Sequence, residues 1–501
     1  MGEIRKQAIL SSIVIYAGFG IGFVNTWLFI RSGIGDFTPA QYGLTRLFFD
    51  VGTLMFAVAS LGVISVIFKF FPYYQERVPY KQNDLYGRAF LFAGIGFSLV
   101  LLGGWLFEPL IIRKFSERSL LFVDYYYWIF FFGIGILLFN ILDAVSVSNR
   151  QAILPNFLRE TGLRFITCLL LVLYVFKIID FKLFIQLFSF QFLIIAVFLL
   201  IILRSRKQLP LTLHKSIVTK KFSRKMTTLA GYIYGGSIIT ILSQVIDSIL
   251  IASISEKGIH DAGVYNLATY IANLIQVPQR SMISATIPVL VLAWKNKHMH
   301  EIDRLYKRSS INLLLVGLFL FFSIWMNFSD LFELLGIQND YKAGMSVVLI
   351  IGITKLIDAG TGINAQIIST SSQWRFEFIT GILLVLLMLP LNYILIKEYG
   401  ITGSAYANLL SFTIYNLVRY GFLWYRYRLQ PFTPKTFYSI LIAAGIYFIV
   451  TFFFNEVSGW GGLILRNLCF SVFFIGAVFV FNLTPDAGQL WNHLKFRFRK
   501  A

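Results

Sequence analysis

The sequence has few charged residues for its length. Only 14% of its 501 residues are charged, whereas 57% are hydrophobic and 17% are aromatic. Soluble globular domains carry about 25% charged residues. In water, a chain of this length would form several domains, and each would lack the charges that its surface requires. We therefore predict a membrane protein, and the mean hydropathy of +0.72 agrees with this prediction.

Cysteine and histidine are also scarce, which excludes several kinds of site. The two cysteines, Cys168 and Cys469, both lie in apolar runs, which argues against a disulfide framework or a cysteine-based metal site. The five histidines lie in polar connections or near the ends of apolar runs, and no HExxH motif is present. A GxxxxGKS or GxxxxGKT motif is also missing, which excludes a P-loop ATPase. We expect no metal and no cofactor.

Apolar runs of about 20 residues recur along the whole chain, which predicts many transmembrane helices. Charged residues, proline or glycine separate about fourteen such runs. The first run is longer than the core of a signal peptide and lacks a small-residue cleavage site, so we expect it to remain as a helix. The predicted fold class is an all-α polytopic membrane protein. The approximate limits of the runs are 8–30, 42–69, 86–107, 122–148, 156–177, 182–203, 226–254, 262–291, 309–328, 341–369, 374–396, 401–425, 435–454 and 462–483.

The charge is strongly basic, with 44 Lys and Arg residues against 24 Asp and Glu residues. In a soluble protein, the net charge of +20 would suggest a nucleic-acid partner. Here the basic residues alternate between successive connections. With a cytoplasmic N-terminus, the inner connections hold roughly three times as many basic residues as the outer ones, as the positive-inside rule predicts. We therefore expect no nucleic-acid binding, and we predict that both termini are cytoplasmic.

The longest polar connection, residues 204–225, contains eight basic and no acidic residues. Positive-inside charge and attraction to anionic lipid headgroups explain this composition, and a linker between two mobile lobes is compatible with it. We predict an N-terminal six-helix lobe in residues 1–203 and a C-terminal six-helix lobe in residues 226–430. Residues 431–501 would then add two further transmembrane helices and a basic cytoplasmic tail.

An internal repeat supports the division into two lobes. The stretch AQYGLTRLFFDV, which contains Gly43, aligns with DAGVYNLATYIA, which contains Gly263. Similarly, NILDAVSVSNRQ, with Asp143, aligns with KLIDAGTGINAQ, with Asp358. An even number of helices in each repeat gives both the same orientation. The lobes would therefore be parallel repeats, related by an axis along the membrane normal.

Two pairs of charged residues lie inside predicted helices, where each charge costs about 2.5–3.5 kcal/mol. Arg46 and Asp50 are four residues apart in the second helix, and Lys355 and Asp358 are three apart in the tenth. Each pair therefore shares one helix face. One interpretation is a self-neutralising pair that lets the helix insert. The other is that both faces line one cavity between the lobes.

Further polar residues lie at or near predicted membrane depth. Asp247 lies in the seventh helix, and Arg280 follows Pro278 in the eighth, where a kink would direct it into the bundle. Arg419 and Asp143 lie near predicted inner ends, where snorkelling explains their charge. Uncharged polar residues that suit water, sugar hydroxyls or interhelical hydrogen bonds include Asn25, Asn273, Gln276, Thr361 and Asn364.

The connections favour a transporter over an enzyme or a channel. A membrane enzyme that acts on lipid-linked sugars generally needs catalytic groups on a sizeable outer loop. The outer connections here are short and poor in paired acids, and no acid/base constellation is present. A filter-like loop, as in ion channels, is also missing.

Three stretches resemble bacterial polysaccharide-export proteins. They are the opening GEIRKQAILSSIVIYAGFGIGFVNT, the stretch FTPAQYGLTRLF at the start of the second helix, and GITGSAYANLLSFTIYNLVRY in the twelfth. Together with the helix number, the charge layout and the repeat, they make the chain similar to O-antigen flippases. These belong to the multidrug/oligosaccharidyl-lipid/polysaccharide (MOP) exporter superfamily.

The resemblance implies two six-helix lobes around a cationic cavity, with two extra C-terminal helices. It further implies a flippase that moves an undecaprenyl-pyrophosphate-linked oligosaccharide across the bacterial inner membrane by alternating access, with a polysaccharide polymerase as a partner. On this resemblance, we assign the cationic substrate site to Arg46, Arg280 and Lys355. The candidates for cavity polar groups or ion coupling are Asn25, Asp50, Asp247, Asp358 and Asn364.

Three alternatives remain open. A lipid II flippase is the nearest, because it belongs to the same superfamily. A multidrug–cation antiporter would typically have twelve helices and one essential deep acidic residue. A membrane enzyme acting on lipid-linked sugars would leave a new covalent product.

Overall fold

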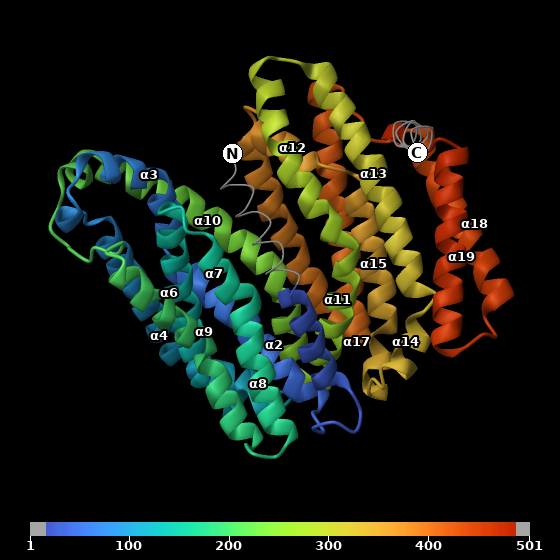
Figure 1. Ribbon diagram of the computed structural model, residues 1–501, viewed down its shortest axis with the longest axis horizontal. Coiled ribbons are helices and arrows are strands. Elements are labelled where there is room, and N and C mark those ends of the chain that lie inside the picture. The colour runs from blue at the N-terminus through green and yellow to red at the C-terminus, as the bar shows by residue number, and fades with distance from the viewer. Residues whose placement is uncertain (1–16, 487–501) are drawn as a thin grey trace, which may run out of the picture. The chain divides into compact units, whose positions relative to one another are not determined.

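The computed structural model describes residues 17–486 (Figure 1). These residues form helices and no β-strand, which confirms the predicted all-α fold class. Ten of the described helices are long and apolar enough to cross a membrane, as expected for a multi-pass membrane protein. The number of about fourteen spans stays a prediction. The predicted cytoplasmic termini lie outside the described residues.

The chain divides into two compact units, residues 1–263 and 264–501. The first unit extends through α10 to the beginning of α11. The second contains the remainder of α11 and all later helices. The predicted lobe boundaries at residues 203, 226 and 430 rest on the sequence repeat, and they stay predictions.

The helices of the first unit follow the predicted apolar runs. Its core is aromatic: the rings of Phe132 on α6 and Phe188 on α9 stack with their centroids 5.5 Å apart, and Phe48 of α2 packs against Phe132. A π-helical turn, Leu158–Gly162, joins α7 to α8. The helices are Ala17–Ile30, α2 (Pro39–Ala59), α3 (Val63–Arg77), α4 (Leu85–Phe115), α5 (Leu120–Asp124), α6 (Trp128–Ser148), α7 (Ile153–Phe157), α8 (Leu163–Val175), α9 (Phe181–Ser205), α10 (Ile217–Ile254) and α11 (Ile259–Asn273).

The predicted run 42–69 is two helices rather than one. Leu61 and Gly62, between α2 and α3, have φ angles of +45° and +73°. This left-handed backbone ends α2. A Cβ atom on Gly62 would lie only 2.5 Å from the carbonyl oxygen of Ala230 on α10. Glycine is therefore required both by the backbone angle and by the close approach of α10.

The two glycines that the repeat aligns lie where helices approach closely. A Cβ atom on Gly43 would lie 2.2 Å from the carbonyl oxygen of Ile259. One on Gly263 would lie 2.1 Å from the carbonyl oxygen of Pro39. The backbones at the beginnings of α2 and α11 are thus in direct contact within the first unit, and only glycine at these two positions leaves room for it.

The helices of the second unit also match predicted runs. One of them, α17 (Trp374–Tyr427), covers two predicted runs. In α17, Gly400 has φ +56° and ψ −135°, so the backbone is not helical there. The predicted helices 374–396 and 401–425 are the two arms on either side of this break. The elements are α12 (Val277–Lys295), α13 (Met299–Trp325), α14 (Phe328–Leu334), α15 (Met345–Gly360), α16 (Asn364–Thr370), α17 (Trp374–Tyr427), α18 (Pro434–Phe454) and α19 (Gly459–Val480).

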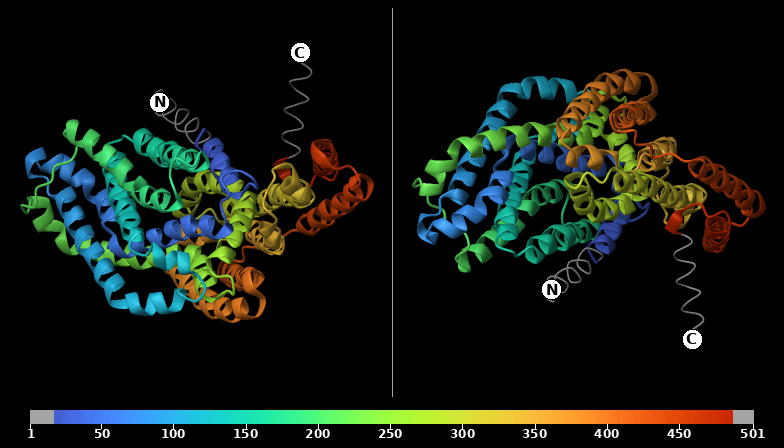
Figure 2. Two further views of the ribbon diagram at one scale, coloured as in Figure 1. Left: turned by 90° about the horizontal axis from the view of Figure 1, so that it is seen from below. Right: turned by 90° about the horizontal axis from the view of Figure 1, so that it is seen from above.

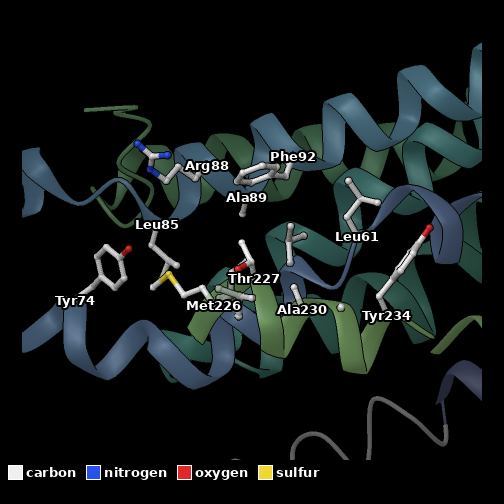
Figure 3. Close-up of a pocket in the computed structure, with 14 residues that line it drawn as sticks. Leu61, Tyr74, Leu85, Arg88, Ala89, Phe92, Met226, Thr227, Ala230 and Tyr234 are labelled. Carbon is white, nitrogen blue, oxygen red and sulfur yellow. The ribbon is translucent and has the colours of Figure 1, made fainter. Parts of the chain in front are cut away.

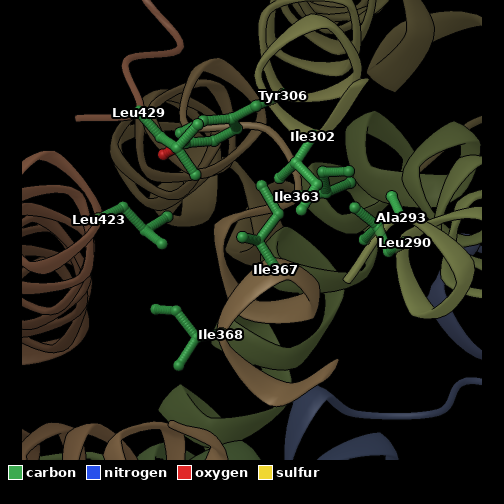
Figure 4. Packing of buried hydrophobic residues seen from close by; sticks show 9 residues of the cluster. All are labelled: Leu290, Ala293, Ile302, Tyr306, Ile363, Ile367, Ile368, Leu423 and Leu429. Carbon is green, nitrogen blue, oxygen red and sulfur yellow. The ribbon is translucent and has the colours of Figure 1, made fainter. Parts of the chain in front are cut away.

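The second unit has two apolar cores. In one, buried side chains of α12, α13, α16 and the second arm of α17 pack together, with Ile367 and Tyr306 fully buried (Figure 4). In the other, α18 and α19 pack side by side and cover α13 (Figures 1 and 2). Phe470 and Phe474 of α19 carry this second contact. The two C-terminal helices are therefore an integral part of the second unit.

Candidate functional site

The first unit brings three of the predicted residues together where α2 meets α10. Arg46 and Asp50 belong to α2, and Asp247 and Ser248 belong to α10. Asp50 accepts a hydrogen bond from Ser248 and interacts electrostatically with both Arg46 and Asp247. Asp50 therefore lies between a cation and a second carboxylate, within a contact between apolar helices.

Arg46 lies among aromatic rings. Its guanidinium carbon is 4.9 Å from the centroid of the Tyr42 ring and 6.0 Å from that of Phe49. Among the described residues, Nε of Arg46 and Oδ2 of Asp50 are buried without a hydrogen-bond partner. The predicted pair shares a helix face, but its members do not saturate each other.

Asn25 is anchored to α8. It is 6% exposed, and its Nδ2 donates to the carbonyl oxygen of Arg164 at 2.8 Å. Its Oδ1 has no partner within the part of the chain that the structure describes. Arg164 pairs with Glu160 at 3.1 Å, and its guanidinium carbon lies 5.0 Å from the centroid of the Phe19 ring.

Asp143 pairs with Arg159, which lies in the π-helical turn. The Asp143 side chain is 17% exposed and that of Arg159 is 37% exposed. The expected snorkelling of Asp143 to the membrane surface stays a prediction. Sequence reasoning missed Arg159 and Arg164 as site candidates. Their position inside the predicted run 156–177 was a signal that could have identified them.

The second unit holds Asp358 of α15 in a shell of side-chain amides. Nε2 of Gln276 and Nε2 of Gln279 donate to Oδ2 of Asp358 at 2.8 and 3.1 Å. Nδ2 of Asn416 donates to its Oδ1 at 3.2 Å. Both carboxylate oxygens are therefore satisfied by neutral donors, which lets a charged group remain inside the helix bundle.

Asn416 extends this network to α16. Its Oδ1 accepts hydrogen bonds from Nδ2 of Asn364 at 2.9 Å and from Oγ1 of Thr361 at 3.0 Å. The predicted Asn364 is thus joined to the predicted Asp358 through a residue that sequence reasoning missed. Asn364 is only 3% exposed.

The two predicted cations of the second unit have different surroundings. Nζ of Lys355 lies 5.8 Å from the centroid of the Phe412 ring. Arg280 is exposed on α12, and Pro278 before it follows a 3₁₀ turn, so the predicted interruption of the helix is present. The assignment of both cations to a substrate site stays a prediction.

Arg419 is buried, at 4% exposure, and does not snorkel as expected. It pairs with Glu377, and its guanidinium carbon lies 3.7 Å from the centroid of the Tyr415 ring. Glu377 and Arg419 belong to the two arms of α17, so this ion pair ties the arms together. The sequence could not identify Glu377, because its partner lies 42 residues away.

An apolar pocket of about 320 Å³ lies between α3, α4 and α10 (Figure 3). At its polar end, Nε of Arg88 donates to Oδ2 of the fully buried Asp84 at 2.6 Å. Oγ1 of Thr219 donates to the same oxygen at 2.7 Å, and Nη2 of Arg88 donates to the carbonyl oxygen of Leu213 at 3.0 Å. These bonds fix the basic connection 204–225 against α4.

Within residues 17–486, no group of three or more His, Cys, Asp or Glu side chains is arranged to hold a metal ion. The clusters that the structure does describe are a carboxylate between a basic group and a second carboxylate in the first unit, and an amide-bound carboxylate in the second.

A family model described as "Polysaccharide biosynthesis protein" matches residues 4–294, which is more than half of the chain. The chain belongs to this family. The resemblance to polysaccharide-export proteins seen in the sequence is thereby confirmed. No curated protein matches the chain.

Solved structures of MOP superfamily transporters share the fold. The lipid II flippase MurJ, in an inward closed conformation, is 15% identical with a TM-score of 0.70, over 95% of this chain and 99% of that one. An inward-facing multidrug resistance MATE transporter is 15% identical with a TM-score of 0.65, over 83% and 94%. A MOP transporter from Pyrococcus furiosus is 15% identical with a TM-score of 0.52, over 85% and 96%.

Proposed function

We propose that this protein is a flippase for an undecaprenyl-pyrophosphate-linked oligosaccharide, an O-antigen or another surface polysaccharide repeat unit. It would act in the bacterial inner membrane by alternating access. The observation that carries the proposal is Arg46. Its side chain belongs to an apolar helix long enough to span a membrane, in a polysaccharide-biosynthesis family member, and its Nε has no hydrogen-bond partner within residues 17–486. An arginine at this depth is costly without a partner. Pyrophosphate supplies the oxygens that a guanidinium binds bidentately.

The other polar groups suit the remainder of this substrate. Lys355 and Arg280 would add cations for the pyrophosphate, and Asn25 and Asn364 would serve the sugar hydroxyls. The inside-negative potential favours the export of anions. Moving two negative charges outward gains roughly 4–5 kcal/mol per 100 mV, which would help to drive flipping. A polysaccharide polymerase would then use the exported repeat unit.

The test is translocation of a fluorescent lipid-linked oligosaccharide in proteoliposomes. We expect Arg46→Gln to lower the flipping rate about tenfold or more, since it removes a charge-assisted contact. Arg46→Lys keeps the charge and is the matched control, with a smaller loss. Lys355→Gln tests the second unit in the same way. Full activity of a folded Arg46→Gln/Lys355→Gln double variant would discard this site, and an inactive wild type would discard the substrate.

Ion coupling is a second component of the proposal. Asp50, with Asp247 beside it, and Asp358 are the groups that would take up a proton or a sodium ion. We expect the flipping rate to fall when both ion gradients are collapsed at fixed membrane potential. An unchanged rate would show that the potential alone drives transport, and the two carboxylates would lose this role.

A lipid II flippase is the second candidate function. The match to MurJ over 95% of this chain supports it, whereas the MATE transporter matches 83%. Flipping of lipid II together with rejection of other pyrophosphate-linked oligosaccharides would favour it. Drug efflux that depends on a single deep carboxylate would instead favour the antiporter branch.

A further inference from the structure

The second unit contains a basic pocket that lies apart from the Asp358 network. Its volume is about 670 Å³, and it is formed by the first turns of α13, the beginning of α18 and the segment after α19. The predicted topology puts this end of the helices at the cytoplasmic surface. The basic side chains that line it are His300, Arg304, Lys307, Arg308 and Lys435.

Two of these cations are already neutralised. Nζ of Lys307 lies 2.6 Å from Oδ2 of Asp303, and Nε of Arg308 donates to Oδ2 of Asp486 at 2.9 Å. Lys435, by contrast, donates to a neutral group, the carbonyl oxygen of Asn482, at 2.5 Å.

Arg304 is exposed and influences Asp486 only through the electrostatic field. In the described part of the chain, neither Arg304 nor Lys435 has a carboxylate within 4.0 Å. The pocket therefore carries an excess of two positive charges with His300 neutral. It also contains the N-terminus of α18, whose dipole favours an anion.

Apolar side chains form the remainder of the pocket. Ile311 of α13, Tyr438 of α18 and Leu483 line it beside the cations, together with Pro434 and Pro485. A soluble anion needs only the charged part. A phosphate that is attached to hydrocarbon would occupy both parts, because its chain would replace water on the apolar side chains.

We propose that this pocket binds the phosphate of an anionic phospholipid, with Arg304 and Lys435 as the two recognition cations. The headgroup lies between these side chains, and the beginning of its hydrocarbon lies on Tyr438 and Ile311. This site shares no lining residue with the proposed transport site, and it does not depend on the transported substrate.

The test is binding of phosphatidylglycerol to the full-length protein in detergent, followed by native mass spectrometry. We expect Arg304→Gln and Lys435→Gln each to weaken the tightest binding about fivefold, and their combination about twentyfold, given the contribution of one basic residue near a charged surface. Arg304→Lys should keep the affinity. Arg224→Gln is the matched control, because it removes an exposed charge from the first turns of α10 in the first unit. It should reduce only diffuse attraction of anionic lipid and leave the tightest binding unchanged.

Four results would overturn the proposal. Equal loss in Arg224→Gln and Arg304→Gln would mean that diffuse charge attracts the lipid. Unchanged binding in the folded double variant, with folding checked by its melting temperature, would remove the pocket from recognition. Displacement of phosphatidylglycerol by millimolar inorganic pyrophosphate would identify a soluble phosphate as the ligand. Equal binding of phosphatidylcholine would also exclude recognition of the anionic headgroup.

Discussion

The two units differ in how the carboxylates inside their helix bundles are hydrogen-bonded. In the second unit, both oxygens of Asp358 accept hydrogen bonds from amide side chains. In the first unit, Asp50 has a buried oxygen without a partner in the described residues, beside a second carboxylate, Asp247. A group whose bonds are all made resists change, whereas one with an unmade bond gains from a ligand or a proton.

The arginines of the two clusters differ in their ion pairs. Arg419 of the second unit pairs with Glu377 and packs on Tyr415. Arg46 of the first unit lies near Asp50 but forms no ion pair within 4.0 Å among the described residues, whereas Nε is without a hydrogen-bond partner there in both arginines. We infer that the second unit's cluster holds helices together and that the first unit's cluster is the more reactive one. This difference can be tested by making the same substitution in each unit.

The largest difference is expected from the two arginines. Arg419→Gln leaves the partly buried Glu377 carboxylate without its cation, and we expect it to lower the free energy of unfolding by about 2–3 kcal/mol. Arg46→Gln should lower it by less than about 1 kcal/mol, because within residues 17–486 that arginine has no carboxylate within 4.0 Å. Thermal or denaturant unfolding of the solubilised protein measures both values.

A second substitution separates pairing from packing. If the pair is responsible, Glu377→Gln should recover part of the stability that Arg419→Gln loses, which a double-mutant cycle would show as a coupling. Equal losses from Arg419→Gln and Arg46→Gln would contradict the contrast between the units.

Substitution of Asp358 and Asp50 should give a smaller difference in the free energy of unfolding than substitution of the two arginines. In Asp358→Asn, one carboxylate oxygen becomes an NH2 group that faces an amide donor from Gln276, Gln279 or Asn416. We expect a loss of about 2 kcal/mol in the free energy of unfolding. Asp50→Asn should change it by less than about 1 kcal/mol, because that carboxylate already has an unsatisfied oxygen.

In flipping assays we expect the opposite order, with a larger loss of transport rate in Asp50→Asn than in Asp358→Asn. If Asp50→Asn is stable but slow in transport, while the folded fraction of Asp358→Asn remains active, the first unit's cluster is the functional one. A destabilised Asp50→Asn with normal transport would assign it a structural role instead.

The sequence predicted these clusters only in part, because it reports polarity at membrane depth and not which helices are neighbours. Arg46, Asp50, Asp247 and Asp358 were all predicted because charge inside an apolar run is costly. Ser248, Gln279 and Asn416, which donate hydrogen bonds to Asp50 and Asp358, were not. The break at Gly400 was predicted as a boundary between two runs, since glycine there interrupts the apolar pattern.

The wrong and the missing assignments have the same cause, which is that the sequence does not show which side chains of other helices lie nearby. Arg419 was expected to snorkel because it lies near the end of a run, yet it is buried and pairs with Glu377 on the other arm of α17. Gln279, which donates to Asp358, also went unnoticed, because an isolated glutamine in an apolar helix has no sequence pattern that identifies its acceptor.

The smallest expected effect concerns Asp486, a satisfied carboxylate of the second unit outside the membrane spans. Burial opposes its ionisation, but hydrogen bonds from Arg308 and Asn312 and the charges of Arg308 and Arg304 outweigh burial and hold the pKa of Asp486 below its usual value. Since this pKa is lower in the folded protein, the ionised group stabilises the fold at pH above about 4, and this contribution is lost as the pH falls through the folded-state pKa.

The measurement is the melting temperature of the solubilised protein between about pH 3 and pH 7, for the wild type and Asp486→Asn. Because the Asp486 and Arg308 side chains are partly exposed, solvent screening limits the expected gap to about 1–3 °C at neutral pH. The gap should close below about pH 4, while the exposed Asp340→Asn should show none at any pH. A gap that is unchanged at low pH would mean that the carboxylate stabilises the end of α19 by its shape and not by its charge. In that case, the stabilisation by Asp486 in the second unit would come from side-chain packing and not from the ionised carboxylate.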